Sequence, residues 1–259
     1  MHKKVDILSW IYILAGLFAL ILLSYFSFFS NLPKKDIRKR RDEITVLTRN
    51  NANSYYIYRE QPNGFEYELA RSFADYMDWE LNIETKGWTE LLKAVNTPEG
   101  DIVAAGMTIT PERKKKASFS NPYMNIQQQV ILHRRNHSIN RINDLDGKQV
   151  HVRNETTYQS RLREINKNRN IDINIVTYND MPTEELIRKV AKKDIEITVA
   201  DSNIALLNRR YYPNIKIAFP IQERQALGWA VEQGSEELLQ EINRFFEKIK
   251  ESGLYGKIY

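Results

Sequence analysis

The chain has 259 residues, 42% of them hydrophobic and 27% charged, a balance that is ordinary for a globular protein and allows one large domain or two small ones. It contains no cysteine, so disulfides, thiolate metal sites and lipoprotein attachment are excluded. The formal net charge of +5 is largely local and does not indicate a nucleic-acid-binding protein.

Residues 7–29 form an uncharged, strongly apolar stretch that ends in a cluster of aromatic residues. As a helix, this stretch would extend roughly 35 Å, which is enough to cross the hydrocarbon core of a bilayer. A cleaved signal peptide is the alternative, but the length of the stretch and the lack of an obvious cleavage pattern favour an uncleaved helix. We therefore predict one N-terminal transmembrane helix within a membrane anchor over residues 1–33.

A basic linker over residues 34–43 follows the predicted anchor. By the positive-inside rule, its lysines and arginines would leave the body of the protein in the cytoplasm. They could instead contact anionic headgroups, although a solvated linker is the simpler interpretation. The charge pattern thus conflicts with the extracytoplasmic placement inferred below, and both orientations stay open at this point.

From residue 44 onward, the pattern alternates between strands and helices. The first run has apolar strand segments separated by helices with apolar residues at helical spacing. Strands are predicted at residues 44–48, 81–83 and 101–105, and helices at residues 64–76 and 89–95. This order is typical of a mostly parallel sheet with covered faces.

A second run of the same kind follows. Strands are predicted at residues 148–152, 173–177 and 195–200, and helices at residues 158–165, 184–191, 203–209 and 236–251. The fold class is therefore α/β with two lobes. In open α/β sheets, ligands bind beyond the carboxyl ends of the strands, so two such lobes predict a site in a crevice between them.

The first candidate site lies at residues 106–113, directly after a predicted strand. Gly106 permits close approach of the backbone, Thr108 offers a hydroxyl, and Arg113 offers a planar fork that pairs a carboxylate through two hydrogen bonds. Thr110 and Pro111 are a helix start, whose dipole favours an anion. Alone, Arg113 would be interpreted as a surface arginine, but this context predicts a clasp for a carboxylate.

Three further segments follow predicted strands. Asp201 could hold an ammonium group or cap the next helix, and both roles are compatible. The backbone near Arg153 and the hydroxyl of Thr156 could add contacts. Trp88 could lie against the ligand or pack in the core, with neither interpretation favoured.

The motif at residues 104–113, with Phe-Ser-Asn-Pro-Tyr at residues 119–123, resembles the family 3 solute-binding proteins, which serve amino-acid transporters and related sensors. The resemblance runs from about residue 44 to residue 259. It implies a Venus-flytrap fold, with lobe 1 at about 44–130 and 226–259 and lobe 2 at about 131–225, and with crossings near 127–131 and 225–230. It also implies that Gly106, Thr108 and Arg113 hold an amino-acid carboxylate and that Asp201 holds the amino group.

A narrower resemblance is carried by residues 55–59, 64–70, 127–129 and 198–202, which are similar to the amino-terminal module of the membrane-bound lytic murein transglycosylase F family. It adds Tyr55 to the candidate ligand-binding residues. In that family, an anchored periplasmic module senses amino acids or peptidoglycan stem peptides and regulates a following catalytic domain. The resemblance implies a periplasmic domain here, which is our reason for setting the charge rule aside.

The catalytic domain of that family would begin after residue 259, so we expect a binding or sensory module and not an enzyme. No phosphate loop or cluster of metal ligands is present in the sequence, and no cofactor is predicted. Arg49 stands where amino-acid binders commonly carry an acidic residue, which leaves room for a more negatively charged ligand. A membrane-tethered receptor for an uptake transporter of the ABC type is the alternative function. An enzyme on this fold, such as a dehydratase of small carboxylic acids, is a third.

Overall fold

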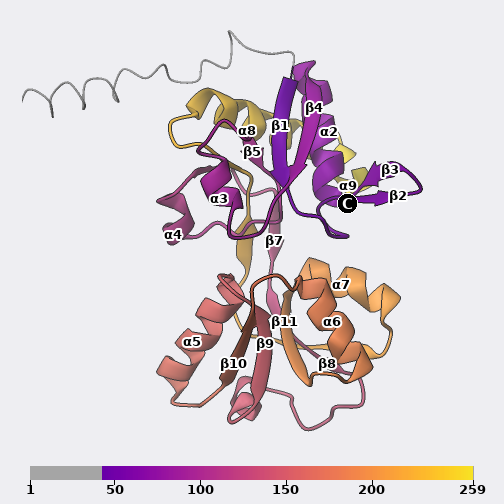
Figure 1. Ribbon diagram of the computed structural model, residues 1–259, viewed down its shortest axis with the longest axis vertical. Helices are drawn as coiled ribbons and strands as arrows, with labels where there is room; N and C mark the ends of the chain where they lie inside the picture. The colour runs from indigo at the N-terminus through magenta and orange to yellow at the C-terminus, as the bar shows by residue number, and fades with distance from the viewer. Residues whose placement is uncertain (1–42, 259) are drawn as a thin grey trace, which may run out of the picture. The chain divides into compact units, whose positions relative to one another are not determined.

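The computed structural model describes residues 43–258, which form two lobes, each built on a five-stranded sheet (Figure 1). The predicted anchor and all but the last residue of the predicted linker lie outside the described residues. Within residues 43–258, none of the helices combines the length and the hydropathy needed to cross a bilayer.

Lobe 1 contains the first sheet, with strand order β4-β1-β5-β14-β6. Its strands are β1 (Glu43–Thr48), β4 (Glu80–Thr85), β5 (Ile102–Val103), β6 (Ser118–Phe119) and β14 (Ala230–Val231). β1 is parallel to β4 and β5, whereas β14 is antiparallel to β5 and β6. Its helices are α2 (Phe65–Met77), α3 (Leu91–Ala94), α4 (Pro111–Lys114), α8 (Glu236–Glu251) and α9 (Leu254–Ile258), and a hairpin joins β2 (Tyr56–Tyr58) to β3 (Gln61–Asn63).

An aromatic core holds α2 and α8 against this sheet. The ring of Phe73 on α2 lies 5.4 Å from that of Phe245 on α8, and Trp229 lies 4.9 Å from Phe246, in edge-on geometries that favour aromatic pairs. The apolar stripes predicted on both helices are buried here. α2 begins after Gly64, where a Cβ atom would lie 2.3 Å from a backbone oxygen of Ser54, so the helix start depends on glycine.

Lobe 2 contains the second sheet, with strand order β10-β9-β11-β8-β12. Its elements are β8 (Gln128–His133), η2 (Ile142–Leu145), β9 (Gln149–Arg153), α5 (Thr157–Arg169), β10 (Asn174–Tyr178), α6 (Thr183–Lys192), β11 (Ile197–Asp201), α7 (Ser202–Tyr211) and β12 (Ile215–Pro220). β9 is parallel to β10 and β11, as the alternating pattern predicted, whereas β8 is antiparallel to β11 and β12. Val130, Leu132 and Val199 are among its fully buried core residues.

Two strands connect the lobes. β7 (Met124–Ile126) and β13 (Gln225–Leu227) pair antiparallel, so the two crossings lie side by side. β7 ends just before the first predicted crossing at residues 127–131, most of which belongs to β8 of the lobe 2 sheet. β13 lies within the second predicted crossing, at residues 225–230. Lobe 2 is therefore one continuous segment inserted between two parts of lobe 1 (Figure 1).

Candidate functional site

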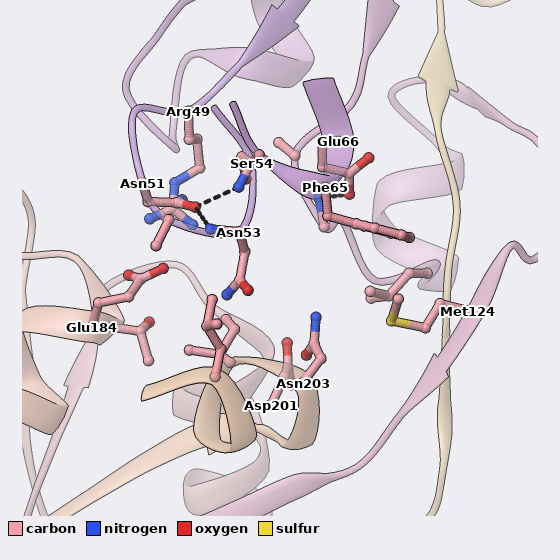
Figure 2. Close-up of a pocket in the computed structure, with 18 of the residues that line it drawn as sticks. Arg49, Asn51, Asn53, Ser54, Phe65, Glu66, Met124, Glu184, Asp201 and Asn203 are labelled. Carbon is pink, nitrogen blue, oxygen red and sulfur yellow. Dashed lines mark hydrogen bonds between the residues drawn. The ribbon is translucent and has the colours of Figure 1, made fainter. Parts of the chain in front are cut away.

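A cavity of about 640 Å³ lies between the lobes and is lined by residues of both. This volume is in the range of small-molecule sites, about 300–1,000 Å³. The lining comes from segments that follow β1 and β5 in lobe 1 and β9 and β11 in lobe 2, as expected for the carboxyl ends of strands in α/β sheets. Figure 2 shows Arg49 and Glu66 of lobe 1 on one side and Glu184, Asp201 and Asn203 of lobe 2 on the other.

Arg113 is positioned by the short helix α4. The hydroxyl of Thr110 accepts a hydrogen bond from the backbone N–H of Arg113 at 3.2 Å, and Pro111 occupies the first turn, as the sequence predicted. The Nη1 of Arg113 donates to the carbonyl of Thr108 at 2.9 Å, which orients the guanidinium. Burial lowers the pKa of Arg113 to about 10, against the opposing attraction of Asp201, so the group stays cationic at neutral pH.

Asp201 ends β11 and is only 6% exposed. It occupies the capping position of α7, yet its side chain makes no capping hydrogen bond, and its Oδ1 has no partner among the described residues. Burial raises the pKa of Asp201 to about 6, against a hydrogen bond from the Tyr158 hydroxyl and the attraction of Arg113. The carboxylate is therefore available to a cationic group that enters the cavity.

Trp88 is surrounded by three guanidinium groups. The guanidinium carbons of Arg113, Arg49 and Arg153 lie over its ring at 5.0, 5.3 and 5.7 Å from the centroid, within the range of cation–π interaction. Its indole N–H donates to the carbonyl of Glu155 at 3.1 Å, which is a contact between lobe 1 and lobe 2. Trp88 therefore both positions cations and joins the lobes at the cavity.

Glu66 is hydrogen-bonded to the backbone of the Gly106 segment and was not predicted as a site residue. It is 3% exposed and accepts hydrogen bonds from the N–H of Gly106 at 2.7 Å, the indole N–H of Trp229 at 2.9 Å and the hydroxyl of Tyr123. Burial raises its pKa, and these three donors oppose the rise. Because Glu66 occupies the Gly106 amide, that amide is not free for a ligand; Gly106 contributes its left-handed backbone, at φ 63°. The sequence carried a sign of this burial, since Glu66 lies three residues before Leu69 and seven before Phe73, a spacing that places all three on one face of α2.

Several buried polar atoms in the cavity lack a partner among the described residues. They are Asn53 Nδ2, Arg153 Nε and Nη1, both carboxylate oxygens of Glu184, Asp201 Oδ1 and Asn203 Oδ1. Buried polar groups are nearly always hydrogen-bonded, because leaving one unpaired costs about 1–3 kcal/mol. Their concentration in one cavity fits a site that is completed by a polar ligand.

The cavity brings together seven of the eight predicted site residues, drawn from both lobes. They are Trp88, Gly106, Thr108, Arg113, Arg153, Thr156 and Asp201. Tyr55 is not among the lining residues, and its ring packs edge-on against Tyr67 at 5.7 Å. The hydroxyl of Thr156 donates to the carbonyl of Arg153 at 2.8 Å and so shapes the turn after β9.

The profile of the bacterial extracellular solute-binding proteins, family 3, matches residues 44–259. The chain belongs to this family. The resemblance read from residues 104–123 is thereby confirmed, and the paired α/β lobes are those of a periplasmic-binding-protein fold.

This solute-binding domain is similar to proteins named membrane-bound lytic murein transglycosylase F. The protein from Desulfosudis oleivorans is 52% identical over 221 residues, which are 85% of this chain and 48% of the relative. The protein from Pseudomonas fluorescens is 33% identical over 218 residues, covering 83% of this chain and 45% of the relative. The chain thus spans less than half the length of these relatives.

Two solved structures with the same fold are described as amino-acid-binding proteins. An ancestral arginine-binding protein bound to arginine superposes with a TM-score of 0.76 and 27% identity, covering 85% of this chain and 97% of that one. An ancestral amino acid-binding protein, described as a precursor of cyclohexadienyl dehydratase, superposes with a TM-score of 0.75 and 28% identity, covering 86% of this chain and 95% of that one.

Proposed function

We propose that the domain binds a small zwitterionic ligand, an amino acid or a peptidoglycan-derived peptide, in the cavity between its lobes. The ligand carboxylate pairs with Arg113, and its ammonium group pairs with Asp201. The observation that carries this proposal is that a cation and a carboxylate from opposite lobes line one cavity, with Oδ1 of Asp201 buried and unpartnered. Arg113 and Asp201 lie close enough for the charge of each to shift the pKa of the other. Solved relatives named as arginine-binding and amino acid-binding proteins support the ligand class.

Binding acts through closure of the two lobes. Arg113 belongs to lobe 1 and Asp201 to lobe 2, so one zwitterion that contacts both stabilises the closed arrangement over an open one. The paired strands β7 and β13 are the hinge about which lobe 2 turns. The indole N–H of Trp88 donates to the carbonyl of Glu155 only while the lobes are together.

The domain serves as a membrane-anchored sensory module in the periplasm, held by residues 1–33, and regulates a lytic transglycosylase. Support comes from the relatives named membrane-bound lytic murein transglycosylase F, which match over less than half of their length. A tethered receptor for an ABC-type uptake transporter is the second candidate, favoured by the amino acid-binding proteins among the solved structures. A physical complex with a transglycosylase supports the first role, and one with a permease supports the second.

A thermal-shift screen of the purified full chain against amino acids and peptidoglycan stem peptides tests the binding function. A ligand that binds the native state raises the melting temperature by mass action, by an amount set by its concentration relative to its Kd. We expect at least one member of the two sets to raise it, and the shift to disappear in Arg113→Ala. No shift with any member, at concentrations up to several millimolar, contradicts the proposal.

A further inference from the structure

Two arginines besides Arg113 reach the cavity, and they come from different lobes. Arg49 directly follows β1 of lobe 1, and Arg153 ends β9 of lobe 2. Their guanidinium carbons lie 5.3 and 5.7 Å from the ring centroid of Trp88. Closure of the lobes therefore gathers both cations around the same indole that Arg113 contacts.

Neither guanidinium is paired within the part of the chain that the structure describes. Arg153 is 7% exposed, and its Nε and Nη1 are buried without a hydrogen-bond partner. Arg49 forms no side-chain hydrogen bond or direct ion pair with another residue of the range 43–258. Burial, and then repulsion by Arg49, lowers the pKa of Arg153 to about 10. Two cations that repel each other in a cavity are stabilised by an anion that lies between them.

The acidic groups near Trp88 attract these arginines without pairing directly with Arg49 or Arg153. Asp201 attracts Arg113, and Glu184 on α6 attracts both Arg49 and Arg153. Glu184 makes no direct ion pair with either arginine, and both of its carboxylate oxygens are buried and unpartnered. Asp180 also attracts Arg153, but neither arginine has a direct ion pair within residues 43–258. A second ligand carboxylate between the two guanidiniums would supply the close anionic partner that both lack.

We propose that Arg49 and Arg153 form a second carboxylate subsite, so that the preferred ligand is a dicarboxylic amino acid or a short peptide with two carboxylates. This inference rests on the proposed function, because Arg113 and Asp201 hold the amino-acid end of the same ligand. A second carboxylate placed between two planar guanidinium forks receives charge-assisted hydrogen bonds from both lobes. Because the subsite is complete only when the lobes are closed, a ligand with the second carboxylate stabilises the closed arrangement more than a ligand without it.

Titration calorimetry on the full chain tests this with pairs that differ only in a distal carboxylate or amide. The pairs are aspartate and asparagine, glutamate and glutamine, and the dipeptides alanyl-glutamate and alanyl-glutamine. We expect the dicarboxylate of at least one pair to bind at least about tenfold more tightly than its amide, as charge-assisted hydrogen bonds imply. Arg49→Gln and Arg153→Gln should reduce that preference to near unity, because they weaken binding of the dicarboxylate more than binding of its amide.

Arg163 on α5 is exposed and lies outside the cavity, so Arg163→Gln removes the same charge at a distance and should keep the preference. If Arg153→Gln unfolds, as a melting curve would show, Arg153→Lys keeps the charge without the fork and should give an intermediate preference. Equal binding of both members of every pair overturns the second subsite and leaves the proposed function intact. Equal weakening of both members by the arginine substitutions also overturns it, because the arginines would then act only in closure. Failure of all six compounds to bind, while another amino acid or a stem peptide raises the melting temperature, overturns the second subsite and leaves the proposed function intact.

Discussion

Replacing Arg113 with alanine tests the central contact of the site. The substitution removes both arms of a fork that is held by the Thr108 carbonyl at 2.9 Å and aimed into the cavity. Each charge-assisted hydrogen bond contributes about 1.5–3 kcal/mol, so losing a bidentate pair should cost at least about 3 kcal/mol, a hundredfold or more in Kd. Asp201 also loses the attraction of this neighbouring cation, which in the wild type lowers the pKa of Asp201.

Titration calorimetry with the amino acid or peptide that gives the largest thermal shift measures this loss. At pH 7 the alanine variant should bind at least a hundredfold more weakly, and its affinity should keep rising up to a higher pH than that of the wild type, since the pKa of Asp201 rises further. Arg113→Lys is the matched control: it keeps the positive charge but not the fork, so it should lie between the two proteins. An alanine variant that binds with unchanged affinity refutes the assignment of the carboxylate to Arg113.

Three further predictions concern other parts of the molecule. Because burial raises the pKa of Asp201 to about 6, affinity for an ammonium group should fall about tenfold from pH 7 to pH 5. The contribution of Asp201 to the stability of the ligand-free fold should increase as pH falls from 6 toward 4, because the folded state binds the proton more tightly than the unfolded state. Asp201→Asn should flatten the first trend in calorimetry and the second in denaturant melts. Trp88→Phe keeps a ring but loses the donor to the Glu155 carbonyl, so small-angle scattering should show a larger radius of gyration without ligand; an unchanged radius would rule out a closing role for this contact. Gly100→Ala places a Cβ 2.4 Å from Leu47 in the core, and the free energy of unfolding should drop by about 1–3 kcal/mol; no measurable loss would show that Leu47 can move aside.

The parts of the fold that were predictable have a strong local signal. The bounds predicted for the last helix, residues 236–251, agree with those of α8, because its apolar stripe is long and regular. The parallel strands around β1 and β9 also follow from apolar runs between helices. Short antiparallel strands such as β14, with two residues, have no local pattern of their own, because they are defined by pairing with strands more than a hundred residues away.

The site was predictable where a residue lies at the end of a strand or in a recognisable motif shortly after one, as Asp201 and Arg113 do. The seven predicted residues among those that line the cavity were found in this way, and their roles in binding remain predictions. Glu184 and Asn203 were missed, because each reaches the cavity from the first turn of a helix and is brought there only by the meeting of two lobes. Arg49 was recognised as unusual, but its neighbours Trp88 and Arg153 lie far away in sequence, so the cluster of cations was not foreseen.

In the proposed closure, lobe 2 moves relative to the ends of the described segment, because it is inserted between β7 and β13. Both ends of the described segment, Glu43 and Ile258, belong to lobe 1 (Figure 1). Any neighbouring domain on the same polypeptide is therefore tethered to the lobe that carries Arg113, whereas the lobe that carries Asp201 has no covalent neighbour except lobe 1. A partner that responds to the ligand must then bind the surface of lobe 2 differently in the open and closed arrangements. The response to the ligand therefore depends on a non-covalent contact with lobe 2 and not on a pull transmitted through the polypeptide.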